Sequence, residues 1–163
     1  MKILLLSCCA PCCCAVIEKM ARDGYDFAVA FYNPNIVPAA EYEKKRWRNL
    51  IKGLENEPER GRRCDVCFYM RLKRVMEYAR ENGFDAVASV LGVSRYKDLA
   101  QVNRAAQKAS AECGVPYVEI EGRKGGMQDR RQLLIRELGL YAQDYCGCKP
   151  RVRETADKKT PEL

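Results

Sequence analysis

The side chains with the most evident chemistry in this chain are cysteine thiols. The chain has ten cysteines in 163 residues and no histidine. The cysteines are Cys8, Cys9, Cys12, Cys13, Cys14, Cys64, Cys67, Cys113, Cys146 and Cys148. Thiols grouped in this way, in a reducing compartment, usually bind a metal or carry out redox chemistry. The absence of histidine excludes imidazole-ligated metals, cysteine–histidine pairs and serine–histidine–aspartate triads.

Four of these thiols suit a metal centre of either of two kinds. A four-iron cluster takes four ligands, usually thiolates, and so does a structural zinc ion. Cys8 and Cys9 supply two, and Cys64 and Cys67, at the start of a helix, supply two more. Spacing alone leaves zinc and iron–sulfur near even, although adjacent cysteines suit a larger cluster, or two neighbouring sites, somewhat better. Cys12 is a further candidate ligand.

The pair Cys146 and Cys148 calls for a separate interpretation. Gly147 between them gives the backbone freedom to turn. The two sulfurs could ligate a second metal or form a strained disulfide, a type of bond that tends to be labile or catalytic. We expect Cys13, Cys14 and Cys113 to be bystanders that pack as small apolar residues.

Short apolar runs alternate with helical patterns along the chain. Strands are expected over 3–7, 27–31, 86–91 and 117–120, and helices over 11–22, 41–54, 64–81, 98–112 and 130–138. This alternation predicts an α/β fold, a parallel sheet with helices on both faces. We expect a single domain over 1–153 and a disordered tail over 154–163. Functional sites of such sheets lie beyond the carboxyl ends of the strands, where Cys8 and Cys9 follow the first strand.

The charge balance allows, but does not require, a nucleic-acid partner. The net charge is +7, and basic residues flank the Cys-x-x-Cys and follow the Cys-x-Cys. Such sets either bind RNA phosphates or form solvated helix faces. No run approaches the ~20 apolar residues of a membrane span, and the first apolar run is too short for a signal peptide. We therefore expect a cytoplasmic protein.

A series of short motifs connects these features. They are Ser7-Cys8-Cys9-Ala10-Pro11-Cys12, Phe31-Tyr32-Asn33-Pro34-Asn35-Ile36 with Pro38, Glu41 and Tyr42, the run from Gly53 to Gly61, Arg63-Cys64 with Cys67, Arg71-Leu72, Ser94-Arg95-Tyr96-Lys97, Arg123-Lys124-Gly125-Gly126 and Tyr145-Cys146-Gly147-Cys148. Their order and spacing resemble the QueH-type epoxyqueuosine reductases over nearly the whole chain. That family reduces epoxyqueuosine to queuosine at the wobble position of certain tRNA anticodons.

The resemblance implies specific roles for the cysteines. Cys8, Cys9, Cys64 and Cys67 would hold a [4Fe-4S] cluster. Cys146 and Cys148 would form a redox-active pair or ligate an additional mononuclear iron. The partners would be tRNA bearing epoxyqueuosine and an unidentified electron donor, and the fold would be similar to PP-loop proteins. Candidate proton donors or substrate contacts are Tyr32, Asp65, Tyr96 and Tyr145.

Two departures and two competing hypotheses accompany the resemblance. Many members carry a histidine where this chain has Leu6, and Cys13 and Cys14 replace other small residues, but no motif cysteine is missing. An ATP-dependent RNA thiolation enzyme would need a Ser-Gly-Gly-x-Asp-Ser-type loop after the first strand, where this chain has the cysteines. A zinc-stabilised RNA-binding module would be colourless rather than brown.

Overall fold

The computed structural model describes residues 1–34 and 41–142, and side chains within the helix that begins at residue 41 are described from residue 45. In these ranges a parallel sheet runs in the order β2-β1-β3-β4. Its strands are β1 (Lys2–Ser7), β2 (Asp26–Phe31), β3 (Ala86–Ser89) and β4 (Tyr117–Val118). The helices are α1 (Ala10–Arg22), α2 (Glu41–Leu50), α3 (Arg62–Glu81), α4 (Leu99–Cys113) and α5 (Met127–Glu137). The predicted α/β fold with a parallel sheet is confirmed.

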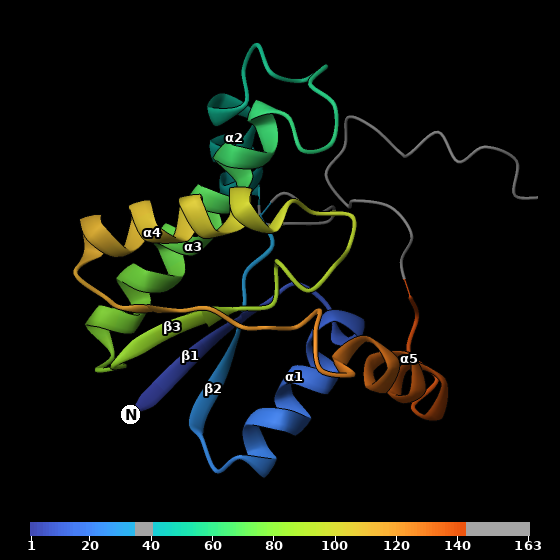
Figure 1. Cartoon of the computed structure of the whole chain (residues 1–163). Coiled ribbons are helices and arrows are strands. Elements are labelled where there is room, and N and C mark those ends of the chain that lie inside the picture. The colour runs from blue at the N-terminus through green and yellow to red at the C-terminus, as the bar shows by residue number, and fades with distance from the viewer. Residues whose placement is uncertain (35–40, 143–163) are drawn as a thin grey trace, which may run out of the picture.

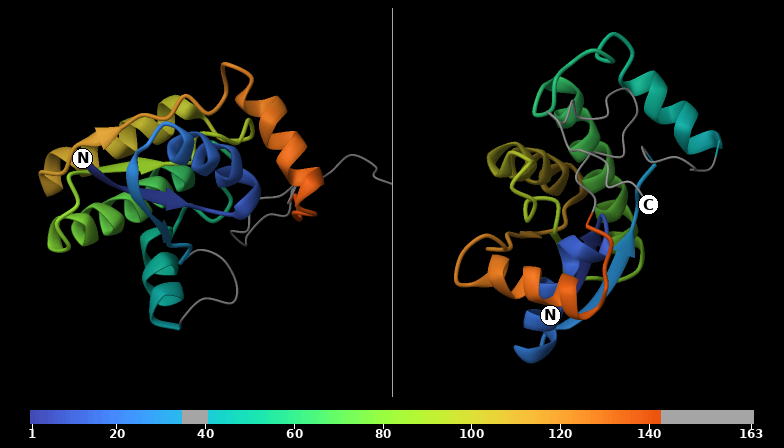
Figure 2. Two further views of the ribbon diagram at one scale, coloured as in Figure 1. Left: turned by 90° about the horizontal axis from the view of Figure 1, so that it is seen from below. Right: turned by 90° about the vertical axis from the view of Figure 1, so that its right-hand side faces the viewer.

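Helices cover both faces of this sheet. The helices α3 and α4 pack together on one face, and α1 and α5 pack together on the other (Figures 1 and 2). The helix α2 stands apart, beyond the carboxyl end of the sheet and beside the start of α3 (Figure 1). Trp47 of α2 and Ile51 pack there against Cys67 and Met70 of α3, in a small apolar cluster separate from the main core.

The central strand β1 is deeply buried. Its residues Ile3, Leu4, Leu5 and Leu6 are each at most 2% exposed, and it pairs with both β2 and β3. Burial of a leucine side chain contributes about 1.5–3 kcal/mol, so this strand has little freedom to shift. The residues that follow its carboxyl end therefore start from a fixed position.

The strand order places a topological switch point at that end, the position that is called the crevice of a parallel α/β sheet. From β1 the chain passes to β2, which lies on one side of β1, and later to β3, which lies on the other side of β1. The order therefore reverses at β1, and the loops after β1 and β3 leave the sheet in opposite directions, which is where parallel α/β sheets bind ligands. Cys8 begins one loop, and residues 90–98 form the other.

The element boundaries differ from the predicted ones in a few places. The third strand ends at Ser89 rather than residue 91, because the Ser89 hydroxyl accepts a hydrogen bond of 3.0 Å from the Leu91 N–H and turns the chain. The last helix begins at Met127, after Gly125 and Gly126 at φ of 59° and 75°. The predicted tail lies outside the described residues. Within the described residues, no helix is both long enough and apolar enough to cross a membrane.

Candidate metal centre

Three thiols meet where β1 ends and α1 begins. The sulfurs of Cys8, Cys9 and Cys12 all lie within 4.8 Å of one another, and the Cys8 and Cys9 sulfurs are 3.8 Å apart. Pro11 suits the first turn of α1, because a proline there loses no helical hydrogen bond. The helix thus starts directly after Cys9 and brings Cys12 back over the two cysteines. This is the one cluster of three or more potential metal ligands among the side chains that the structure describes, those of residues 1–34 and 45–142.

The surroundings of Cys8 favour a thiolate. Hydrogen bonds from the Cys12 and Cys9 thiols hold the pKa of Cys8 well below its usual value, and the positive charges of Lys97 and Arg71 act in the same direction. The pKa of Cys12 is raised, because its thiol donates to Cys8 and Cys9 and is buried. Of the three thiols, Cys8 is therefore the one whose surroundings most favour the thiolate, the form that binds metal.

A hydrogen-bond network ties the Cys8 loop to α3. The Asn33 side-chain amide donates to the Cys8 carbonyl at 3.0 Å. The buried Arg71 of α3 in turn donates to the Asn33 side-chain oxygen and, at 2.9 Å, to the Tyr32 carbonyl. The loops after β1 and β2 are thus held together by one arginine of the neighbouring helix.

The predicted ligands Cys64 and Cys67 lie on α3 and are not members of the three-sulfur group. The predicted helix start at this Cys-x-x-Cys is confirmed, since α3 begins at Arg62. Cys64 packs against the main core, which includes Cys8 and Cys12, and Cys67 packs in the cluster around Trp47. Spacings of three and four residues place Cys64, Cys67 and Arg71 on one helix face. The face that carries both cysteines is therefore the face from which Arg71 reaches the Asn33–Cys8 network.

Several arginines near the cysteines bond within the protein. Arg63 is 2% exposed and donates to the Glu55 carbonyl at 2.7 Å, while Arg131 donates to the Pro11 carbonyl at 2.6 Å. Arg130 pairs with Glu18. These side chains build the site's surroundings, so positive charge along the sequence does not by itself mark an RNA surface. Exposed cations do lie on α2, at Lys45, Arg46 and Arg48.

The other residues singled out from the sequence have varied positions. Cys13 and Cys14 donate to carbonyls of their own helix, and Cys113 is buried on α4. Tyr32 is half-buried, Asp65 is exposed in the first turn of α3, and Tyr96 is 40% exposed in the loop after β3. Cys146, Cys148 and Tyr145 lie outside the described residues.

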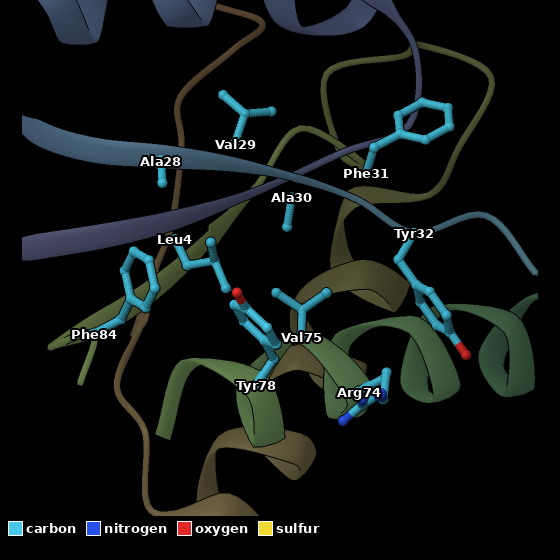
Figure 3. A pocket seen from close by; sticks show the side chains of 10 residues that line it. All are labelled: Leu4, Ala28, Val29, Ala30, Phe31, Tyr32, Arg74, Val75, Tyr78 and Phe84. Carbon is cyan, nitrogen blue, oxygen red and sulfur yellow. The ribbon is translucent and has the colours of Figure 1, made fainter. Parts of the chain in front are cut away.

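A cavity of about 330 Å³ opens between the edge strand β2 and α3, with Leu4 of β1 also in its lining (Figure 3). Its walls are mainly apolar and aromatic, with Tyr32, Tyr78 and Phe84 around it and Arg74 at its rim. No cysteine lines it. The cavity is therefore separate from the sulfur chemistry, although Tyr32 borders it and its carbonyl belongs to the Arg71 network.

The sequence assigned no individual role to three residues that contact Cys8 directly or, in the case of Arg71, through Asn33. These are Asn33, Arg71 and Lys97, whose ammonium nitrogen lies 3.9 Å from the Cys8 sulfur. Each belongs to a motif that the sequence displays, so a signal was present. The position of Arg71 four residues after Cys67 also indicated a shared helix face.

Comparison with known proteins gives a consistent result. The family model described as "Epoxyqueuosine reductase QueH" matches residues 3–47 and 41–153. A protein of that name from Histophilus somni is 39% identical, over 94% of this chain and 73% of its own length. The one from Acinetobacter baylyi is 37% identical over 94% and 82%, and the one from Thermotoga maritima is 30% identical over 96% and 93%.

Proposed function

The chain belongs to the epoxyqueuosine reductase QueH family, and we propose that it reduces epoxyqueuosine to queuosine at the wobble position of tRNA. The observation that carries this proposal is the gathering of Cys8, Cys9 and Cys12 at the crevice between β1 and β3. Thiolates at this place can hold a redox centre at the end of the sheet where parallel α/β proteins bind their ligands.

The donor set fits an iron–sulfur cluster. Thiols are its usual ligands, and this chain offers no histidine for a mixed site. We propose Cys8, Cys9, Cys64 and Cys67 as the ligands of a [4Fe-4S] cluster, with Cys12 beside them. Cys64 and Cys67 lie on α3, outside the compact three-sulfur group, and would complete the set of four ligands. Bound there, the cluster supplies electrons one at a time.

The residues of the chain prepare this site before substrate arrives. Asn33 and Arg71 fix the main chain at Cys8, and the burial of Cys8 at 7% exposure limits the access of water. Conversion of an epoxide to an alkene consumes two electrons and two protons and releases the oxygen as water. The protons must come from groups at the crevice or from water, and Tyr32, Asp65 and Tyr96 are the described candidates, with Tyr145 outside the described residues.

The finer assignments belong to the same proposal. Cys146 and Cys148 would relay electrons as a redox pair or ligate an additional iron, and the electron donor is a separate, unidentified partner. The tRNA would bind by phosphate contacts to the exposed cations Lys45, Arg46 and Arg48 of α2. This helix lies beside the start of α3, where Cys64 and Cys67 are.

Activity of the complete chain tests the function directly. Iron-loaded, anaerobic protein is incubated with a chemical reductant and tRNA that carries epoxyqueuosine, and the digested nucleosides are separated by mass. We expect loss of one oxygen atom from the modified nucleoside in every turnover. A nucleoside that stays unchanged, with full iron and reductant present, would overturn the proposal.

A further inference from the structure

The loop of residues 90–98, between β3 and α4, follows the strand that lies beside β1, the strand whose end carries Cys8. Near its end, Lys97 places its ammonium nitrogen 3.9 Å from the Cys8 sulfur. The two residues are 89 positions apart in the sequence. A lysine side chain is long and flexible, so the contact has meaning only if the main chain of the loop is itself held in place.

Arg123 holds that main chain from one side. Its guanidinium donates to three carbonyls of the loop, those of Gly92 at 2.7 Å, Ser94 at 2.6 Å and Lys97 at 2.7 Å. The last is the carbonyl of the lysine that reaches Cys8. Planar guanidinium donors fix geometry in a way that a lysine ammonium cannot, and this arginine therefore acts on the lysine's backbone rather than on a ligand.

Arg60 holds the loop from the other side. It donates to the carbonyls of Tyr96 at 3.2 Å and Arg95 at 3.1 Å. Its own backbone has a φ of 66°, which is left-handed and costs a residue other than glycine roughly 1–2 kcal/mol. Gln101 of α4 donates to the Arg60 carbonyl at 3.1 Å. The unfavourable conformation thus persists where three segments are hydrogen-bonded together.

Close packing completes the support of the loop. A Cβ atom at Gly122, next to Arg123, would lie 2.5 Å from a methyl group of Val93. Gln128 of α5 donates both to the Val93 carbonyl at 3.2 Å and to the Gly122 carbonyl at 2.6 Å. Residues 122–128 therefore pack against the loop that carries Lys97, bond to it and limit its movement.

We propose that the positive charge of Lys97 raises the reduction potential of the bound cluster. Arg123 and Arg60 hold the loop that carries Lys97, and so keep this charge beside Cys8. The inference rests on the proposed cluster. Reduction adds one negative charge to the centre, and a cation held near a ligand sulfur stabilises that charge. A positive charge that is present but free to move would stabilise it less.

The test compares midpoint potentials of complete, iron-loaded chains by anaerobic redox titration, followed by visible absorption. We expect Lys97→Met to have a lower midpoint potential than wild type, Lys97→Arg to stay near wild type, and Arg123→Gln to shift in the same direction as Lys97→Met by a smaller amount. The control is Lys124→Met, because Lys124 is the exposed neighbour of Arg123, with its side chain 81% exposed. The control should leave the potential unchanged.

A loaded Lys97→Met chain with the wild-type potential would overturn the inference. If Lys97→Met binds no iron, Lys97→Gln takes its place in the same comparison. If Lys97→Met and Lys97→Gln both lose iron while Lys97→Arg retains it, the site needs a cation at position 97. If all three variants lose iron, the charge of Lys97 is not what matters, and the inference is contradicted. Failure of the proposed cluster itself is seen separately, because wild type would then show no cluster to titrate.

Discussion

Two regions of the molecule position the cysteines that we propose as cluster ligands, and they do so by different physical means. After β1, the end of a buried central strand and the immediate start of α1 set Cys8, Cys9 and Cys12 within 4.8 Å of one another. At the start of α3, Cys64 and Cys67 are set by helical spacing, and Cys67 lies in the small apolar cluster with Trp47. In the first region the turn from strand to helix brings three sulfurs together, whereas in the second the two cysteines follow helical spacing and pack in two different apolar clusters. Substitutions should therefore affect the two regions differently.

The largest effect is expected at the strand end. Cys8→Ala removes the sulfur that contacts both Cys9 and Lys97, and we expect it to abolish iron binding and turnover. Iron and sulfide are counted after anaerobic reconstitution. The control is Cys113→Ala, a buried cysteine on α4, which should retain both properties. A Cys8→Ala variant that still binds its full iron would show that Cys8 is not a ligand of the centre.

The helix start gives the next test. We expect Cys64→Ala to lose most of its cluster iron and turnover, because the proposed site then has three ligands, whereas Cys12→Ala keeps more of both. Both variants are measured by iron count and by turnover at equal protein concentration. If instead the Cys12 variant loses iron and the Cys64 variant keeps it, then, among the described residues, Cys8, Cys9 and Cys12 are the ligands, and Cys64 is not one.

A smaller effect is expected from the helix beside α3. Replacement of Lys45, Arg46 and Arg48 by glutamine should raise the KM for tRNA by about tenfold and weaken its dependence on salt, since each phosphate contact contributes to the salt slope. Iron content should not change. The matched control carries Lys19→Gln, Arg22→Gln and Lys108→Gln, exposed cations of α1 and α4. Equal losses in the two triple variants would remove α2 from the tRNA surface.

The smallest effect is expected at Arg71, the residue of α3 whose hydrogen bonds connect this helix to the Cys8 loop through Asn33. Arg71→Lys keeps a positive charge but loses the planar donors that join Tyr32 and Asn33. We expect a loss of about 1–2 kcal/mol in the free energy of unfolding, with iron content reduced but not abolished. Urea unfolding measures the first and iron analysis the second. Wild-type stability in this variant would show that the hydrogen bonds do not couple α3 to the Cys8 loop.

The sequence predicted the site better where local rules suffice. A strand that ends in cysteines, followed by a proline at a helix start, placed Cys8 and Cys9 at the carboxyl end of the sheet. A Cys-x-x-Cys before a helical stripe placed Cys64 and Cys67 in the first turns of α3. Both placements follow from backbone periodicity, which a single sequence displays.

The supporting residues could not be predicted in the same way. Lys97 and Arg123 act through contacts with residues far away in sequence. Charge alone does not distinguish an arginine that binds a phosphate from one that binds carbonyls, and Arg63, Arg71 and Arg123 proved to bind carbonyls or a side-chain amide. Their roles depend on which loops meet at the crevice, and that is a property of the fold.

The most direct test of the central claim is an iron and sulfide count, with an absorption spectrum, on the complete chain purified without oxygen. We predict a brown protein that absorbs at about 400 nm and holds about four irons and four sulfides per chain. A colourless protein that contains zinc and no sulfide would contradict it.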